Sequence, residues 1–83
     1  MPVCYFARGE TRYKEGEYEE AVKDLTKGLE LSPAPQGYEM RARAFEHLSM
    51  SNKALSDYKA ALRMAPNYKS AQEGLERLSQ KKD

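Results

Sequence analysis

The sequence predicts an all-α fold: an α-solenoid of two antiparallel helix-turn-helix repeats with a fifth helix at the C-terminal end. Three observations predict it: an internal repeat with a period of 33 residues, apolar residues at helical spacing within each repeat, and prolines near the repeat boundaries. A period between about 20 and 50 residues is the signature of stacked units that share one continuous core.

The internal repeat is visible when the sequence is shifted by 33 residues. Seven pairs of residues are then identical, where average residue usage would give roughly two. The identical pairs are Pro2/Pro35, Tyr5/Tyr38, Arg8/Arg41, Ala21/Ala54, Asp24/Asp57, Leu29/Leu62 and Pro33/Pro66. A chain of 83 residues has room for one small domain. We therefore expect a single domain with repeat one at residues 2–34, repeat two at 35–68 and a capping helix at 69–83.

The first helix of each repeat is indicated by aromatic and small residues at near-helical intervals. These residues are Tyr5, Gly9 and Tyr13 in repeat one, and Tyr38, Ala42, Phe45 and Leu48 in repeat two. Gly9 and Ala42 are small enough to let a second helix approach closely, since a bulky side chain would hold the two axes apart. We expect them to face Ala21 and Ala54 in the antiparallel partner helices.

The second helix of each repeat has apolar or small residues at offsets 0, 1, 4, 7 and 8, on one side of a helix with about 3.6 residues per turn. They are Ala21, Val22, Leu25, Gly28 and Leu29 in repeat one, and Ala54, Leu55, Tyr58, Ala61 and Leu62 in repeat two. A final amphipathic pattern has Tyr68, Ala71, Leu75 and Leu78 on one side. This terminal helix would cover the apolar edge of the last repeat, as end caps do in solenoids.

The breaks between helices follow from local chemistry. Gly16 can end a helix in a left-handed turn. The equivalent turn, residues 49–52, lacks glycine, and we expect its serines or Asn52 to cap the next helix. The prolines within residues 33–35 and at Pro66 would break a helix interior, and they therefore mark the ends of units.

The composition excludes several classes of function. The 14 Lys and Arg and 13 Asp and Glu are interspersed and leave a formal net charge of +1, so we expect neither nucleic-acid nor membrane-surface binding. One cysteine and one histidine are too few for a zinc site, and we expect no metal and no cofactor. No apolar run approaches the ~18–20 residues of a membrane span and no secretory signal is recognisable, so we expect a cytoplasmic protein.

Catalytic chemistry has little support in the sequence. His47 lacks a positioned nucleophile, and we expect Cys4 to be a small, partly buried hydrophobe rather than a reactive thiol. No Gly-rich phosphate loop, zincin helix or calcium loop is present. Most carboxylates belong to a solvated helix face, and the spacing predicts ion pairs of Glu10 with Lys14, Glu19 with Lys23, and Glu73 with Arg77. We expect that this protein is not an enzyme.

Both repeats resemble one known family. Residues 7–33 contain Ala-Arg-Gly-Glu, then Tyr-Lys-Glu-Gly-Glu-Tyr-Glu-Glu-Ala, then Lys-Gly-Leu-Glu-Leu-Ser-Pro, and repeat two keeps Tyr38, Ala42, Phe45, Ala54, Tyr58, Ala61 and Pro66. In order and spacing, these residues resemble the tetratricopeptide repeat, whose unit is usually one residue longer. Arg8 and Arg41 replace a common Leu of that family, and Arg12 replaces an aromatic. We expect these arginines to bury their stems and to leave their charged heads in water.

The resemblance implies a protein-interaction module. In this family the first helices of successive units line a concave groove that binds extended or helical segments of partner proteins. Our candidate partner-binding residues, by their matching positions, are Phe6, Tyr13, Lys14, Arg43, His47 and Arg77. Aromatic and Arg side chains dominate binding energy at interfaces. Phe6 has no evident core role beside Tyr5, although it also suits a second role in closing the N-terminal end of the solenoid.

A narrower function within the family is the capture of a C-terminal carboxylate by co-chaperones, which requires several converging donors. The matching positions here are Phe6, Glu10, Met40, Ser70 and Gly74, and none carries the expected side chain. Carboxylate capture would therefore need a different arrangement, such as Lys14, Arg43 and Arg77.

A structural role is the competing hypothesis. Two repeats are fewer than the three usually needed for stability, so the chain is also a candidate for stacking on a copy of itself or on further repeats. The apolar ends of such a homo-oligomer would be Val3, Tyr5 and Phe6 on one side, and Leu75 and Leu78 on the other.

Overall fold

The computed structural model describes residues 2–80, which form five α-helices and no strand. They are α1 (Pro2–Lys14), α2 (Tyr18–Leu31), α3 (Pro35–His47), α4 (Ser51–Met64) and α5 (Lys69–Ser79). The predicted all-α fold is confirmed. The last residues of the predicted capping helix, 81–83, lie outside the described part of the chain. Within residues 2–80, no helix combines the length and apolar character needed to cross a membrane.

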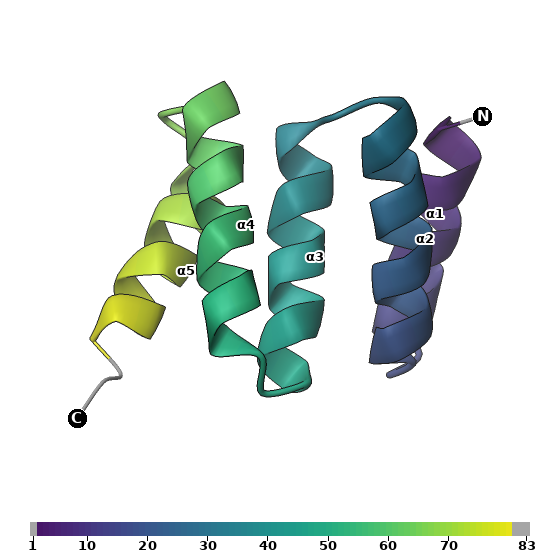
Figure 1. Ribbon diagram of the computed structural model, residues 1–83, viewed down its shortest axis with the longest axis horizontal. Coiled ribbons are helices and arrows are strands. Elements are labelled where there is room, and N and C mark those ends of the chain that lie inside the picture. Colours follow the sequence, from purple (N-terminus) through teal and green to yellow (C-terminus); the bar gives the residue numbers. More distant parts are fainter. Residues whose placement is uncertain (1, 81–83) are drawn as a thin grey trace.

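The helices lie side by side in chain order, with connections at alternating ends, so successive helices are antiparallel (Figure 1). The described part of the chain is elongated, measuring 39 × 25 × 17 Å along its principal axes. Besides packing on its chain neighbours, α3 also contacts both α1 and α5. The first helices of the two repeats and the terminal helix therefore lie along one face, which we call the α1/α3/α5 face.

The two turns inside the repeats use different residues in the same conformation. Gly16 has a φ of +83°, as the sequence predicts, and Ser49, one repeat later, has a φ of +62°. A left-handed backbone conformation is uncommon for residues other than glycine. Ser49 nevertheless adopts it and forms the turn, where the sequence predicted a helix cap. The predicted side-chain cap is wrong, because Met50 occupies the N-cap position of α4 and no side chain caps it.

The core is built from small and apolar residues spaced along the helices. The fully or nearly buried ones are Ala21, Leu25, Leu29, Ala42, Ala44, Phe45, Ala54, Tyr58, Ala61, Ala71 and Leu78. Close approach at Gly9 is confirmed, since a Cβ there would lie 2.8 Å from Cγ of Leu25. Leu25, rather than the expected Ala21, is thus the nearest side chain to Gly9.

Each repeat is closed by the same ion pair between its two helices. Arg8 Nη2 lies 2.9 Å from Asp24 Oδ1, and Arg41 Nε lies 2.7 Å from Asp57 Oδ2. Both arginines donate two hydrogen bonds, one to each carboxylate oxygen. The bidentate geometry satisfies carboxylates that are themselves buried, which makes these pairs part of the fold rather than of the surface.

The expectation that the arginine heads lie in water is wrong for Arg41, whose side chain is 19% exposed, against 58% for Arg8. Arg41 also donates a hydrogen bond from Nη1 to Oγ1 of Thr26 in α2, at 3.0 Å. The hydrogen bond to Asp57 raises the pKa of Arg41, against the lowering effect of burial. Arg41 therefore joins the second repeat to the first.

Candidate functional site

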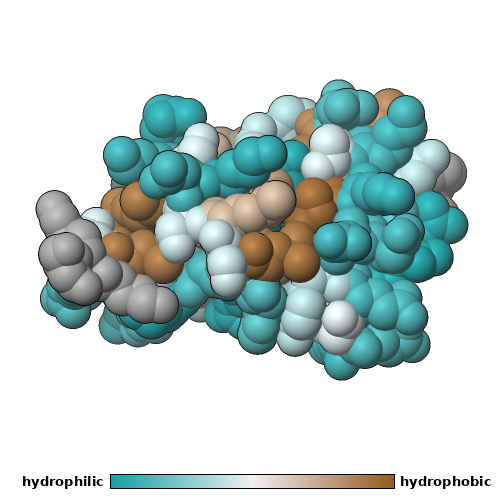
Figure 2. Space-filling view, turned by 60° about the horizontal axis from the view of Figure 1, so that its bottom comes forward, coloured by the Kyte–Doolittle hydropathy of each residue, from teal (hydrophilic) through white to brown (hydrophobic). Residues whose placement is uncertain are grey.

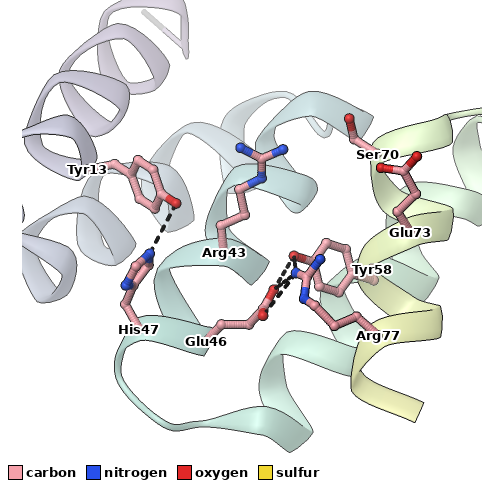
Figure 3. A pocket seen from close by; sticks show the side chains of 8 residues that line it. All are labelled: Tyr13, Arg43, Glu46, His47, Tyr58, Ser70, Glu73 and Arg77. Carbon is pink, nitrogen blue, oxygen red and sulfur yellow. Dashed lines mark hydrogen bonds and ion pairs between the residues drawn. The ribbon is translucent and has the colours of Figure 1, made fainter. Parts of the chain in front are cut away.

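A polar pocket of about 400 Å³ opens on the α1/α3/α5 face. Its lining residues are Tyr13 of α1, Arg43, Glu46 and His47 of α3, Tyr58 of α4, and Ser70, Glu73 and Arg77 of α5 (Figure 3). Four of the six candidate partner-binding residues, Tyr13, Arg43, His47 and Arg77, are thus brought together from three helices. We call this site the polar pocket.

A network of hydrogen bonds on one side of the polar pocket holds Arg77. Nη2 of Arg77 lies 3.0 and 2.7 Å from the two carboxylate oxygens of Glu46, and the hydroxyl of Tyr58 also donates to Glu46. Glu46 thus pairs with Arg77 in place of the expected Glu73, which corrects the predicted ion pair. Burial raises the pKa of Tyr58, and the hydrogen bond to Glu46 raises it further. The network ties α3, α4 and α5 together at the pocket wall.

Arg43 is held by a buried carboxylate on its own helix. Its Nε lies 2.5 Å from Oε2 of Glu39, whose side chain is 6% exposed. Burial lowers the pKa of Arg43, but the adjacent carboxylate of Glu39 outweighs burial and raises the pKa overall. Burial also raises the pKa of Tyr13, which faces Arg43 across the pocket. Arg43 therefore enters the pocket as one half of an ion pair.

His47 is exposed but has two aromatic neighbours from repeat one. Its ring stacks on the ring of Tyr18 with centroids 4.1 Å apart and an angle of 2° between planes. Its Nε2 lies 3.3 Å from the hydroxyl of Tyr13, within hydrogen-bond distance. Tyr13 and Tyr18 also meet edge to face, with centroids 5.5 Å apart. The three rings fix the orientation of His47 and join the end of α3 to the turn between α1 and α2.

A second pocket, of about 190 Å³, lies on the same face between α1 and α3. We call it the apolar pocket, and its lining residues are Phe6, Glu10, Leu25, Ala34, Gln36, Gly37 and Met40. The ring of Phe6 forms its floor and packs tightly, because a Cβ on Gly28 or Gly37 would lie 2.9 or 2.6 Å from Cε1 of that ring. The expectation that Phe6 lacks a packing role is therefore wrong.

The remaining candidate, Lys14, lines neither pocket. Its Nζ lies 3.4 Å from Oε2 of Glu10, which confirms the predicted ion pair, and both side chains are at least half exposed. Lys23 pairs with Glu20, at 3.7 Å, and not with the expected Glu19. Cys4 is exposed rather than partly buried. Among residues 2–80, no group of His, Cys, Asp or Glu is placed to hold a metal ion.

The two pockets are related by the internal repeat. Four residue pairs that are 33 positions apart line them: Glu10/Arg43, Leu25/Tyr58, Gly37/Ser70 and Met40/Glu73. Helical spacing places Glu46, Ser70 and Glu73 on the predicted concave surface, but the six candidate partner-binding residues do not include them, and Tyr58 was expected in the core alone. The helical spacing of Ser70 and Glu73 relative to Arg77 is the signal that would have added them to the site.

Comparisons with known proteins agree with this architecture. Two family models described as Tetratricopeptide repeat match residues 2–35 and 35–68. A curated relative, the bacteriophage adsorption protein A of Escherichia coli (strain K12), is 34% identical over 64 residues, which make up 77% of this chain and 6% of that protein.

Two solved structures show the same arrangement of helices. A structure of the UNC-45 chaperone is 38% identical with a TM-score of 0.88, and the match covers 95% of this chain and 9% of that one. The first TPR of Spaghetti (RPAP3), solved with an HSP90 peptide, is 22% identical with a TM-score of 0.57, covering 95% of this chain and 90% of that one. This chain spans less than a tenth of the length of the adsorption protein and of the UNC-45 chain. With both repeats matched in sequence and in structure, the chain belongs to the tetratricopeptide repeat family.

Proposed function

We propose that this chain is a non-catalytic module that binds a segment of a partner protein along the α1/α3/α5 face. Its family is generally a protein-interaction fold. The observation that carries the proposal is the convergence of Tyr13, Arg43, His47 and Arg77 on one pocket of about 400 Å³. The partner-binding residues we propose are these four together with Phe6 and Lys14, which lie further along the same face.

The polar pocket has the properties of an interaction hot spot. Arg and Tyr side chains are enriched among residues whose truncation weakens binding most. The side chains of Arg43 and Arg77 are 45% and 54% exposed, so they are accessible to a partner. Each is also held by a carboxylate from α3, which reduces the side-chain entropy that binding would otherwise remove.

The peptide-bound neighbour supports the same type of ligand. The first TPR of Spaghetti was solved with the HSP90 peptide SRMEEVD, so a fold of this kind and size accommodates a short segment of another protein. We propose that the ligand of this chain is likewise a segment of a protein, and we do not propose the HSP90 peptide itself as that ligand.

The competing assembly role has less support. Of the five residues expected at the joint, Val3 is 69% exposed, whereas Leu78 is buried and the other three are partly buried. On the face seen in Figure 2, hydrophobic surface forms separate patches between hydrophilic side chains. A joint between solenoid copies would need a continuous apolar patch at an end of the row of helices, and among the five expected residues only Val3 is exposed.

The experiment is selection of binders from a displayed library of random peptides. Peptides selected on the unmodified chain are then tested against the double variant Tyr13→Ala/His47→Ala, which removes two aromatic rings of the pocket lining and leaves its ion pairs unchanged. We expect at least about a tenfold loss of affinity, because hot-spot truncations each cost more than about 1 kcal/mol.

The matched control is Lys27→Ala/Lys59→Ala, which removes two exposed side chains from the outer helices α2 and α4. Circular dichroism checks that both variants keep their helix content. Equal affinity of the selected peptides for the unmodified chain and the pocket variant would reject this face as the binding site.

A further inference from the structure

We infer, on the basis of the proposed function, the chemistry of the partner segment: an extended peptide with one apolar side chain and, about four residues away, one basic side chain. The apolar side chain enters the apolar pocket and the basic one enters the polar pocket. The polar pocket would thus prefer the opposite charge from a site that captures an acidic C-terminal tail.

The cations of the polar pocket are already neutralised within the chain. Arg43 is paired with Glu39 at 2.5 Å and Arg77 with Glu46 at 2.7 Å. An acidic ligand would compete with a carboxylate that is 6% exposed in the first case and 20% exposed in the second. Displacing either one strands a poorly solvated charge, and that cost opposes the binding of an anion.

Glu73 is the pocket charge that remains available. It lines the polar pocket and is exposed, and within residues 2–80 no cation lies within 4.0 Å of its carboxylate. Figure 3 shows its side chain beside Ser70, on the far side of the pocket from Tyr13. Three other carboxylates of the groove are each paired with a cation of the chain: Glu10 with Lys14, Glu39 with Arg43, and Glu46 with Arg77. Glu73 therefore supplies the negative charge by which the groove favours a cation.

The apolar pocket selects a second feature of the ligand. Its volume of about 190 Å³ is comparable to the ~150 Å³ cavities that hold one benzene ring, so it has room for a single leucine- or phenylalanine-sized side chain. Phe6, Leu25 and Met40 line it and offer no hydrogen-bond donor to a carboxylate. An acidic side chain is thus disfavoured in this pocket as well.

The spacing of the two features follows from the repeat. The pockets are lined by opposite halves of α3, at residues within 36–40 and 43–47, so they are offset by about 10 Å along this helix as well as by the ~8–10 Å between packed helices. The resulting ~13 Å corresponds to about four residues of an extended chain, and side chains four residues apart point to the same side of such a chain.

The test uses defined peptides and the full 83-residue chain labelled with ¹⁵N. The probe is a C-terminally amidated Gly/Ser peptide with one leucine and one arginine four residues apart, prepared in both orders. The matched peptides replace the arginine by glutamate or glutamine, or the leucine by serine. Affinities are read from the shifts of backbone amides during titration.

We expect the better arginine peptide to bind about three- to tenfold more tightly than its glutamate counterpart, in line with one or two exposed charge contacts. Glu73→Gln should weaken the arginine peptide about two- to fivefold and leave the glutamine peptide unchanged. Glu76→Gln, on the same helix but outside both pockets, is the matched control and should change neither.

Tighter binding of the glutamate peptide, or an arginine peptide insensitive to Glu73→Gln, would overturn the inferred chemistry. If the glutamate peptide binds and loses affinity in Tyr13→Ala/His47→Ala, the proposed function stands while the inference fails. If no peptide shifts amides of α1, α3 or α5, both are rejected.

Discussion

The two pockets of the α1/α3/α5 face occupy equivalent positions in successive repeats, yet their chemistry is opposite. Met40 and Gly37 line the apolar pocket, and Glu73 and Ser70 take the corresponding places in the polar pocket. The packing residues Ala21 and Ala54, and the Arg–Asp pair of each repeat, are by contrast identical. Positions that close the helix pair are thus repeated, whereas positions that line the two pockets differ.

A second contrast concerns how deeply the repeated ion pair is buried. Arg8 in the first repeat is 58% exposed, whereas Arg41 in the second is 19% exposed. The reason is the neighbourhood: α3 lies between helices on both sides, while α1 begins the row (Figure 1). The same two residues therefore form a surface-facing pair in one repeat and an interior pair in the other.

The largest predicted effect tests this contrast. Asp57→Ala leaves the poorly solvated Arg41 without its carboxylate and should cost about 3 kcal/mol of the free energy of unfolding. Asp24→Ala leaves Arg8, which is 58% exposed, and Arg12, whose Nε lies 3.0 Å from Asp24 Oδ2 and whose side chain is 32% exposed. The loss should be smaller than for Asp57→Ala, because water reaches these guanidinium groups more readily than that of Arg41. Urea unfolding of the two variants measures the difference. Equal losses would show that burial does not distinguish the two pairs.

Phe6→Ala tests whether the floor of the apolar pocket is part of the core. The ring is half-buried against Gly28 and Gly37, so its removal should cost about 2 kcal/mol, less than the ~3–5 kcal/mol of a fully buried ring. Val3→Ala, on the same helix but 69% exposed, is the control and should change the free energy of unfolding by less than about 0.5 kcal/mol. A Phe6 variant as stable as the control would mean that the residue serves binding alone.

Tyr58→Phe tests the network of the polar pocket and has a smaller effect. Losing the hydroxyl that donates to Glu46 should cost about 1 kcal/mol at neutral pH. Burial and Glu46 raise the folded-state pKa above the ordinary value of 10.0, so this stabilisation is fully present below pH 10 and is lost as the pH rises further.

The difference between the unmodified chain and Tyr58→Phe should therefore shrink above about pH 10, because the variant has no hydroxyl to titrate there. Tyr13 and Tyr68, whose pKa values burial also raises, titrate in both proteins and cancel in the comparison. Unfolding measured by circular dichroism at neutral and alkaline pH gives the result. A difference that does not vary with pH would place the hydroxyl outside the stabilising network.

Helical spacing and the repeat were enough to predict the five helices, and the family resemblance selected four candidate residues that meet in one pocket. Spacing along one helix did not predict pairing between helices. Arg77 pairs with Glu46, 31 positions away in the sequence, rather than with Glu73, four positions away. The reason is that α5 packs against α3, which brings the carboxylate of Glu46 to 2.7 Å from Nη2 of Arg77.

The repeated pairs of Arg8 with Asp24 and Arg41 with Asp57 show the same limit. All four residues belong to identical pairs of the internal repeat. Their contact depends on the angle at which the two helices of a repeat pack, and the spacing of residues along the sequence does not determine that angle. The stacking of Tyr18 on His47 likewise joins two repeats and has no signature within either one.

The most direct test determines which of the two pockets each end of a bound peptide occupies. A spin label is attached to the arginine peptide, either next to the leucine or next to the arginine, and the broadening of ¹⁵N amide signals is recorded. We predict that the first label broadens amides of α1 and the first half of α3, and that the second broadens amides of α5 and the end of α3. Broadening that is the same for both labels, or that falls on the outer helices α2 and α4, would contradict the account.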